Sequence, residues 1–139
     1  MKFKYDAQAL QWMSLFEKVT KAKIKDFFLQ QEKLCFIVQP GNLRKGLGPN
    51  KSNVAKMEKL TKRKVKVIEY SDDIKRFISN VFSPLKIVKM EFSDDGIVTL
   101  TGPDQKTRGL MIGAQARNLR LYESVIQKYY PEVKEIKVI

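Results

Sequence analysis

The sequence predicts an α+β protein made of two similar small domains in tandem, at residues 1–71 and 72–139. Two observations predict this fold class. Segments with helical and strand periodicity follow one another in the same order twice along the chain. Each half also contains the same break, a glycine and three further residues between two segments of helical pattern. A chain of 139 residues holds two domains only if both are very small.

The first half contains a helix, two strands, a short helix, a longer helix and a strand. Polar and glycine-containing turns separate these segments. Asp6 can cap the first helix, and Pro40-Gly41-Asn42 ends the second strand. In chain order we expect a helix over 7–19 with apolar residues Leu10, Met13, Phe16 and Val19, strands over 23–30 and 34–39, a short helix to 47, a helix over 52–60 and a strand over 65–70.

The second half repeats this order. Paired aspartates could hold a divalent metal, but Asp72-Asp73 lie where a helix cap favours aspartate, and Asp94-Asp95 lie in a hairpin turn with Asp-Gly chemistry. We therefore expect capping and turn roles for both pairs. In chain order we expect a helix over 74–82, strands over 86–92 and 97–101, a short helix to 112, a helix to 129 and a strand that holds Val133, Ile136 and Val138.

The glycine breaks align when the sequence is shifted by 65 residues, which places Gly48 on Gly113. A break between two helices exposes the first N–H groups of the second helix, and these donors with the helix dipole form a phosphate site. The alternative is an ordinary connection between helices. Because the break occurs twice at the same position of the repeat, we favour a binding site. The same shift places Leu47 on Ile112, Asn53 on Asn118, Val54 on Leu119 and Glu58 on Glu123.

The net charge is +12, from 27 Lys and Arg against 15 Asp and Glu. A surplus of this size favours a polyanionic partner, although a solubilising surface is the alternative. The charge is uneven, because residues 1–71 carry 16 basic and 6 acidic side chains while residues 72–139 carry 11 and 9. We therefore expect a nucleic acid to meet the first half more strongly, with the run KLTKRKVK at 59–66 as a candidate extension of its path.

The composition argues against an enzyme. There is no histidine and one cysteine, which removes Ser-His and Cys-His catalysis, histidine-based metal sites and disulfides. We expect Cys35, inside LCFIV, to pack in the core, as we do Trp12, Phe16, Phe27, Phe28, Phe77 and Phe82. No apolar stretch is long enough for a membrane span, and the first residues lack the apolar segment of a signal peptide. We expect a cytoplasmic protein without cofactor, metal or membrane partner.

Residues 112–121 read IGAQARNLRL, close to the bacterial NusA signature I-G-x-G-G-x-N-V-R-L around the glycine, the asparagine and the Arg-Leu pair. Residues 47–56, LGPNKSNVAK, match it more loosely. On these motifs, nearly the whole chain resembles a tandem KH protein of the archaeal NusA-like transcription factor family. The resemblance implies two prokaryotic-type (type II) KH domains, each a three-stranded mixed sheet with helices packed on one face.

The resemblance also implies a function. KH domains clamp about four nucleotides of single-stranded RNA at a GXXG loop. The protein would then be a monomeric, non-enzymatic factor that regulates transcription elongation and termination through nascent RNA and RNA polymerase. The fourth glycine of the loop is replaced by Lys51 in one repeat and by Ala116 in the other. The predicted RNA-binding residues are Arg44, Lys45, Gly48, Pro49, Asn50, Lys51, Asn53 and Lys56 in the first half, and Arg108, Gly113, Ala114, Gln115, Ala116, Arg117, Asn118 and Arg120 in the second.

Two alternatives stay open at the level of the sequence. A ribosome-associated or rRNA-processing KH protein would show the same features, and co-purification with ribosomal subunits or with polymerase separates the two. A KH-fold protein–protein adaptor that has lost RNA binding also fits, because both loops depart from the GXXG pattern. The absence of affinity for any single strand at low salt would favour the adaptor.

Overall fold

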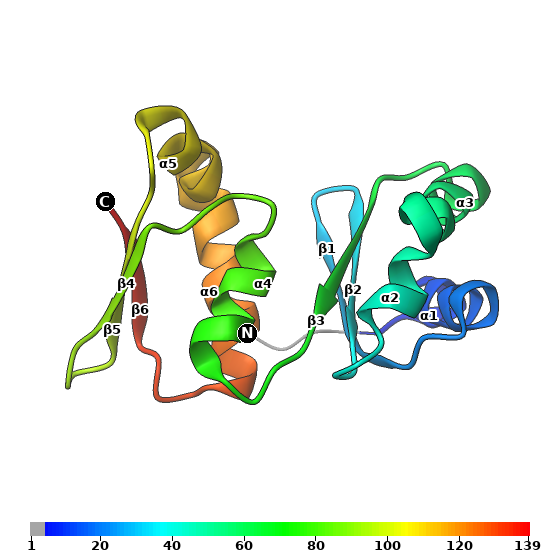
Figure 1. Ribbon diagram of the computed structural model, residues 1–139, viewed down its shortest axis with the longest axis horizontal. Coiled ribbons are helices and arrows are strands. Elements are labelled where there is room, and N and C mark those ends of the chain that lie inside the picture. Colours follow the sequence, from blue (N-terminus) through cyan, green and yellow to red (C-terminus); the bar gives the residue numbers. More distant parts are fainter. Residues whose placement is uncertain (1–4) are drawn as a thin grey trace. The chain divides into compact units, whose positions relative to one another are not determined.

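The computed structural model describes residues 5–139, so the first four residues of the predicted first domain lie outside the described part. The chain separates into two compact units between Ser71 and Asp72. Both units contain the same elements in the same order, in agreement with the repeat in the sequence (Figure 1).

The first unit forms a three-stranded mixed sheet. Its central strand pairs antiparallel with the strand before it and parallel with the strand after it, in the order β1-β2-β3. The elements are α1 (Ala7–Thr20), β1 (Ile24–Gln30), β2 (Lys33–Val38), α2 (Leu43–Leu47), the 3-10 turn η1 (Pro49–Lys51), α3 (Ser52–Thr61) and β3 (Val65–Glu69).

The second unit repeats this topology in the order β4-β5-β6, with one antiparallel and one parallel pair. The predicted α+β class with mixed sheets is therefore confirmed. The elements are α4 (Ile74–Phe82), β4 (Lys89–Phe92), β5 (Ile97–Thr101), α5 (Gln105–Ile112), the 3-10 turn η2 (Ala114–Ala116), α6 (Arg117–Tyr129) and β6 (Glu135–Val138).

In each unit the helices lie on one side of the sheet (Figure 1). The core of the first unit joins α1 and α3 to the strands, and the rings of Phe16 and Phe36 stack there at 4.3 Å between centroids. In the second unit Tyr122 of α6 meets Phe82 of α4 edge-on at 4.9 Å. Burial of such aromatic side chains supplies much of the hydrophobic stabilisation of a small core.

Most residues expected in the core are buried. Phe16, Phe27, Phe28, Phe77 and Phe82 are each at most 4% exposed, whereas Trp12 is half-buried.

Cys35, on the central strand β2, is fully buried, as predicted. Burial raises the pKa of its thiol to about 12, against the opposing effect of Lys66 on the neighbouring strand. The thiol is therefore protonated and unreactive at neutral pH.

Of the four apolar positions predicted for α1, Phe16 is buried and Met13 and Val19 pack partly buried against the core, but Leu10 differs from the prediction. Leu10 is 55% exposed, while Ala9, Phe16 and Thr20 are buried. An α-helix turns 100° per residue, so residues spaced strictly three apart drift around its surface. Residues that share one face are spaced alternately three and four apart.

Two strands begin two or more residues later than predicted. Strand β4 begins at Lys89 and not at residue 86, because the end of α4 continues into a turn in which Leu85 N–H donates to the carbonyl of Phe82. The last strand begins at Glu135, so Val133 lies before it, although it is buried as expected.

Within the described residues, no group of His, Cys, Asp and Glu side chains could hold a metal ion. In the same part of the chain, no helix has the length and hydropathy that crossing a membrane requires.

Candidate nucleic-acid interface

The two glycine loops have the same backbone conformation. Gly48 has φ 73° and ψ 167°, and Gly113 has φ 76° and ψ 173°. The third residues, Asn50 and Gln115, have φ/ψ of 53°/33° and 56°/32°. Two loops with different side chains thus keep one shape, which indicates that the shape itself is what the repeat preserves.

The fourth loop residues also adopt a left-handed backbone. Lys51 has φ 60° and ψ 29°, and Ala116 has φ 59° and ψ 24°. In each loop the N–H of this residue donates to the carbonyl of the first glycine, at 3.0 Å for Lys51 and 3.1 Å for Ala116. Glycine adopts this conformation at no steric cost, whereas a residue with a Cβ is strained there by about 1 kcal/mol. The sequence therefore departs from the GXXG pattern while the backbone keeps the conformation that glycine favours.

An asparagine on the following helix braces each loop. Asn53 Nδ2 donates to the carbonyl of Lys45 at 2.7 Å, and Asn118 Nδ2 donates to the carbonyl of Leu110 at 3.1 Å. Each bond joins the helix after the loop to the helix before it. These asparagines were predicted to bind RNA, and in the structure both form this brace.

The brace explains why each loop begins with glycine. A Cβ at Gly48 would lie 2.8 Å from both Cγ and the backbone N of Asn53. A Cβ at Gly113 would lie 2.8 Å from Cγ and Nδ2 of Asn118. Since real Cβ atoms do not approach other atoms this closely, glycine and asparagine form a pair in each repeat.

The helices behind the loops differ from the other longer helices at their N-termini. Aspartates cap α1, α4 and α5: Asp6 accepts from Ala9 N–H, Asp73 from Lys75 N–H and Asp104 from Thr107 N–H. Helices α3 and α6 follow Lys51 and Ala116, and neither has a side-chain cap or an acidic residue in its first turn. The first N–H groups of these two helices thus face the loops without a carboxylate to neutralise their positive end.

Four basic side chains surround the first loop. Arg44 and Lys45 lie in the last turn of α2, Lys51 closes the loop, and Lys56 lies on the second turn of α3. All four are exposed. The backbone donors of the first loop and these cations are therefore available to the same anion.

The second loop has fewer available cations than predicted from the sequence. Arg117, the first residue of α6, is exposed beside the loop. Arg108 is half-buried five residues before the loop, and a Cβ at Gly102 would lie 2.6 Å from its Cγ, so its side chain packs by the end of β5.

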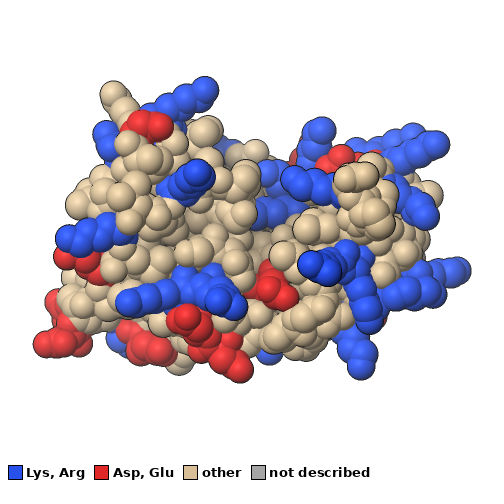
Figure 2. Space-filling view, viewed as in Figure 1, with Lys and Arg blue, Asp and Glu red and all other residues tan. Residues whose placement is uncertain are grey.

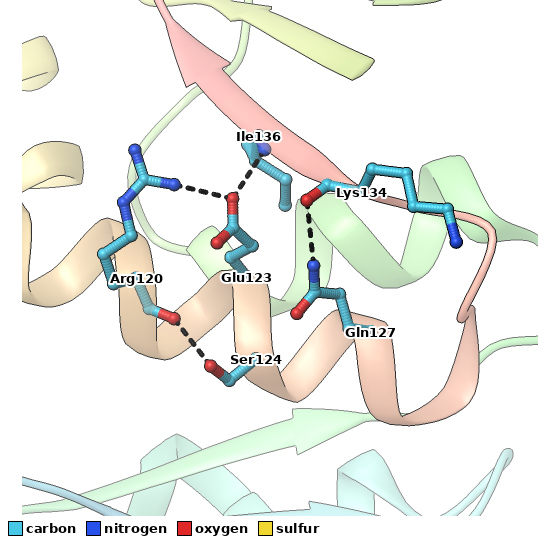
Figure 3. A network of polar contacts seen from close by, with 6 residues as sticks. All are labelled: Arg120, Glu123, Ser124, Gln127, Lys134 and Ile136. Carbon is cyan, nitrogen blue, oxygen red and sulfur yellow. Dashed lines mark hydrogen bonds and ion pairs between the residues drawn. The ribbon is translucent and has the colours of Figure 1, made fainter. Parts of the chain in front are cut away.

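Arg120 is engaged by a carboxylate (Figure 3). Glu123 Oε2 accepts from Arg120 Nη1 at 2.7 Å and from the N–H of Ile136 at 2.8 Å. The side chain of Arg120 remains 50% exposed, while that of Glu123 is 12% exposed. Four further donors of the guanidinium could still meet a phosphate, but the ion pair fixes where they point.

The sequence analysis aligned Glu58 with Glu123 without assigning either a role. Glu58 Oε2 accepts from the N–H of Val65, the first residue of β3, at 3.0 Å. Glu123 makes the corresponding bond to Ile136 of β6. Each glutamate therefore ties the long helix of its repeat to the third strand, and its position in the alignment was the only signal of that role.

The basic run at 59–66 begins at the end of α3 that is remote from the loop and continues into the start of β3. Arg63 lies over the ring of Trp12 at 5.1 Å and donates to the carbonyl of Glu32 at 3.5 Å, so it is partly engaged with the fold. Lys59, Lys62 and Lys64 are exposed. Figure 2 shows Lys and Arg side chains crowded on the visible face of the first unit.

Fold and loops together define a duplicated α+β protein that presents two glycine loops at uncapped helix N-termini among basic side chains. The chain is 30% identical over its full length to the probable transcription termination protein NusA of Methanococcus vannielii, and it covers 81% of that protein. It is 29% identical to the protein of the same name from Methanocaldococcus jannaschii, covering 76% of it. The chain therefore belongs to the archaeal NusA-like family.

Other comparisons are more distant. The NusA protein of Halococcus morrhuae is 24% identical over 88% of both chains. A crystal structure of the protein APE1850 shares the fold, with a TM-score of 0.69 at 21% identity over 94% of this chain and 96% of that one. No family model matches the chain.

Proposed function

We propose that each unit is a prokaryotic-type KH domain and that the protein is a non-enzymatic transcription elongation and termination factor that binds single-stranded RNA. One observation supports this above the others. Two glycine loops with different side chains share one backbone conformation, and each leads into a helix whose N-terminus lacks a side-chain cap. A loop conformation that is the same in both repeats, with backbone N–H donors that no side chain caps, fits the capture of a phosphate.

The binding step follows from the parts of each loop. A phosphate meets the first N–H groups of α3 or α6, which are held in place by the asparagine brace. In the first unit Lys51, Lys45 and Arg44 add charge, so that binding releases counterions and depends on salt. In the second unit Leu110, which takes the position of Lys45, is 51% exposed beside the loop and offers an apolar surface to a base. The first loop thus supplies more electrostatic affinity and the second more apolar contact.

The role in transcription rests on the relatives. The two methanogen relatives share the name probable transcription termination protein NusA, and the chain covers most of their length. A factor of this kind acts on nascent RNA as it leaves RNA polymerase, and we propose both as its partners.

The test is a titration of short single-stranded RNAs at several salt concentrations, with acidic pairs in either loop. Pro49→Asp/Asn50→Asp and Ala114→Asp/Gln115→Asp place carboxylates where phosphate would bind, at exposed positions that tolerate a change of side chain. Each lost phosphate contact should lower the slope of log affinity against log salt by about 0.7. The matched control is Gln8→Asp/Gln11→Asp, which adds the same charge to an exposed face of α1.

The result distinguishes the proposed functions. If the loop variants lose affinity while the control binds like wild type, the loops are RNA clamps. If all three folded variants bind like wild type, affinity comes from general surface charge and the fold serves as an adaptor. Co-purification with RNA polymerase would support the role in transcription. Co-purification with ribosomal subunits would instead support a role in ribosome function or rRNA processing.

A further inference from the structure

The second unit has an open groove at its hairpin end, which the glycine loops do not explain. The groove has a volume of about 690 Å³. Its side chains come from the start of α4, from the β4–β5 hairpin and from the segment before β6. Its apolar lining is Ile74, Phe92, Ile97, Val98 and Val133.

Backbone hydrogen bonds hold the walls of the groove in place. The carbonyl of Gly96, at the tip of the hairpin, accepts from the N–H of Lys134 at 2.7 Å. A Cβ at Gly96 would lie 2.6 Å from the carbonyl oxygen of Glu132, so the hairpin tip packs directly on this segment. Within the hairpin, Ser93 Oγ accepts from Ile97 N–H at 3.0 Å and donates to Asp95. The groove is therefore formed before a ligand arrives.

The rim of the groove is acidic on a strongly basic protein. Asp94, Asp95 and Glu132 line it together with Lys134, and all four side chains are exposed; a second cation, Lys75, lies over Phe92. Figure 2 shows acidic side chains gathered at the lower left, where Figure 1 draws the β4–β5 hairpin. Carboxylates repel phosphate, so this end of the unit is unsuited to RNA and suited to a cationic partner.

Phe92 gives the groove an anchor point. Its ring is 40% exposed, unusual for a phenylalanine, and Lys75 Nζ already lies 5.8 Å from the ring centroid. The ring thus offers both apolar area and a face that accepts a cation. Aromatic anchors of this kind supply much of the affinity at peptide-binding surfaces.

We propose that this groove is a docking site for an extended basic segment of a partner protein, with an apolar side chain seated among Phe92, Ile97 and Val133 and flanking Lys or Arg residues paired with Asp94 and Glu132. The site is separate from the glycine loops and does not depend on the proposed RNA binding. It would let the protein hold RNA with its basic loops and a protein with its acidic groove.

The experiment uses the full chain, labelled for NMR, and a short fluorescent peptide with a central Leu-Phe pair between Lys and Arg residues. The peptide should shift the signals of residues 92–98 and 132–134 and leave those of the loop at 113–116 in place. Replacing the Leu-Phe pair of the peptide by serines, or its cations by glutamates, should abolish the shifts.

Charge reversals at the rim test the assignment by fluorescence anisotropy. Asp94→Lys and Glu132→Lys should each weaken peptide binding by about threefold, and the two together by about tenfold, because each replaces an attraction by a repulsion. Glu91→Lys is the control with the same change of charge, since Glu91 lies on β4, pairs with Lys89 at 3.7 Å and does not line the groove. Phe92→Ser should weaken binding by a similar factor without a change of charge.

Several outcomes would overturn the proposal. Equal effects of Glu91→Lys and the rim variants would reduce the site to general electrostatics. If the peptide shifts NMR signals only elsewhere in the chain, or shifts no signals, the proposed docking site is wrong. Single-stranded RNA that shifts the groove signals would assign this surface to RNA. The loop variants above leave the groove unchanged, so failure of the RNA proposal would not affect this result.

Discussion

At the scale of single residues, the loops show how a conformation can persist when the residue that favours it is lost. Lys51 and Ala116 occupy left-handed backbone positions at φ near 60°, which glycine adopts without strain. Other contacts must hold them there, and the asparagine brace and the bond to the first glycine are the ones that the structure shows.

Replacing Ala116 by glycine should therefore stabilise the second unit. Ala116→Gly relieves the left-handed strain, and we expect a gain of about 1 kcal/mol in the free energy of unfolding. Urea denaturation followed by circular dichroism measures it. Ala114→Gly is the control, because Ala114 is not among the positive-φ residues and the change should destabilise. A loss of stability in Ala116→Gly would mean that alanine is not strained at this position.

A second residue-scale prediction concerns Asp104, the cap of α5. The backbone hydrogen bond from Thr107, then that from the Thr107 side chain, lowers the pKa of this carboxyl. A carboxyl with a lowered pKa in the folded state stabilises the fold above the pKa of the unfolded chain, about 3.9, and loses this contribution as the pH falls through the folded value.

Asp104→Asn isolates this charge, since asparagine can still accept the capping hydrogen bond. We expect the variant to melt below wild type at pH 7 and the two melting temperatures to converge at acidic pH, once the carboxyl of Asp104 is protonated in the folded state as well. Asp94→Asn is the control with the same change of charge, at an exposed position in the β4–β5 turn. A difference between Asp104→Asn and wild type that is independent of pH would assign the effect to something other than the charge.

At the scale of elements, two polar side chains of the long helix tie it to neighbouring elements in each repeat. An asparagine joins this helix to the helix before the loop, and a glutamate joins it to the third strand. The loop is thus fixed between two braced elements, which is what a binding site needs if it is to be formed before its ligand arrives.

Loss of the asparagine brace should weaken the loop more than the fold. Asn53→Ala removes a 2.7 Å hydrogen bond and should cost about 1 kcal/mol of stability, because the carbonyl of Lys45 loses its partner. We expect RNA affinity to fall as well, since the N-terminus of α3 is then less well positioned. Ser52→Ala, at the neighbouring exposed position, is the matched control and should change stability by less than about 0.5 kcal/mol. Unchanged RNA binding by a destabilised Asn53→Ala would separate the brace from binding.

At the scale of the whole molecule, charge is divided between the two units. Residues 1–71 carry 16 basic and 6 acidic side chains, whereas residues 72–139 carry 11 and 9. The structure adds to this imbalance, because the four cations around the first loop are exposed while Arg108 is packed and Arg120 is ion-paired around the second.

The two loops should therefore differ in the salt dependence of RNA binding. The Pro49→Asp/Asn50→Asp variant should lower the salt slope by at least about 0.7 more than the Ala114→Asp/Gln115→Asp variant, which corresponds to one additional phosphate contact. Titrations at matched salt concentrations provide the two slopes. Equal slopes would mean that the surplus charge of the first unit does not contribute at its loop.

Local patterns determined most of the architecture. Periodicity set the order of helices and strands, aspartates marked the starts of α1 and α4, and a shift of 65 residues revealed the repeat together with both loops. These signals are readable because helix caps, turns and amphipathic faces depend on residues that are close together in the chain.

Tertiary structure alone decided which side chains near the loops are available. Helical spacing could not show that Arg108 packs by Gly102 or that Glu123 accepts a hydrogen bond from Ile136 of β6. The acidic groove, too, needs the hairpin tip to meet the segment before β6. Each of these contacts joins separate elements, and a pairing of that kind is selected by packing and hydrogen bonding across the fold, which no local pattern of the sequence records.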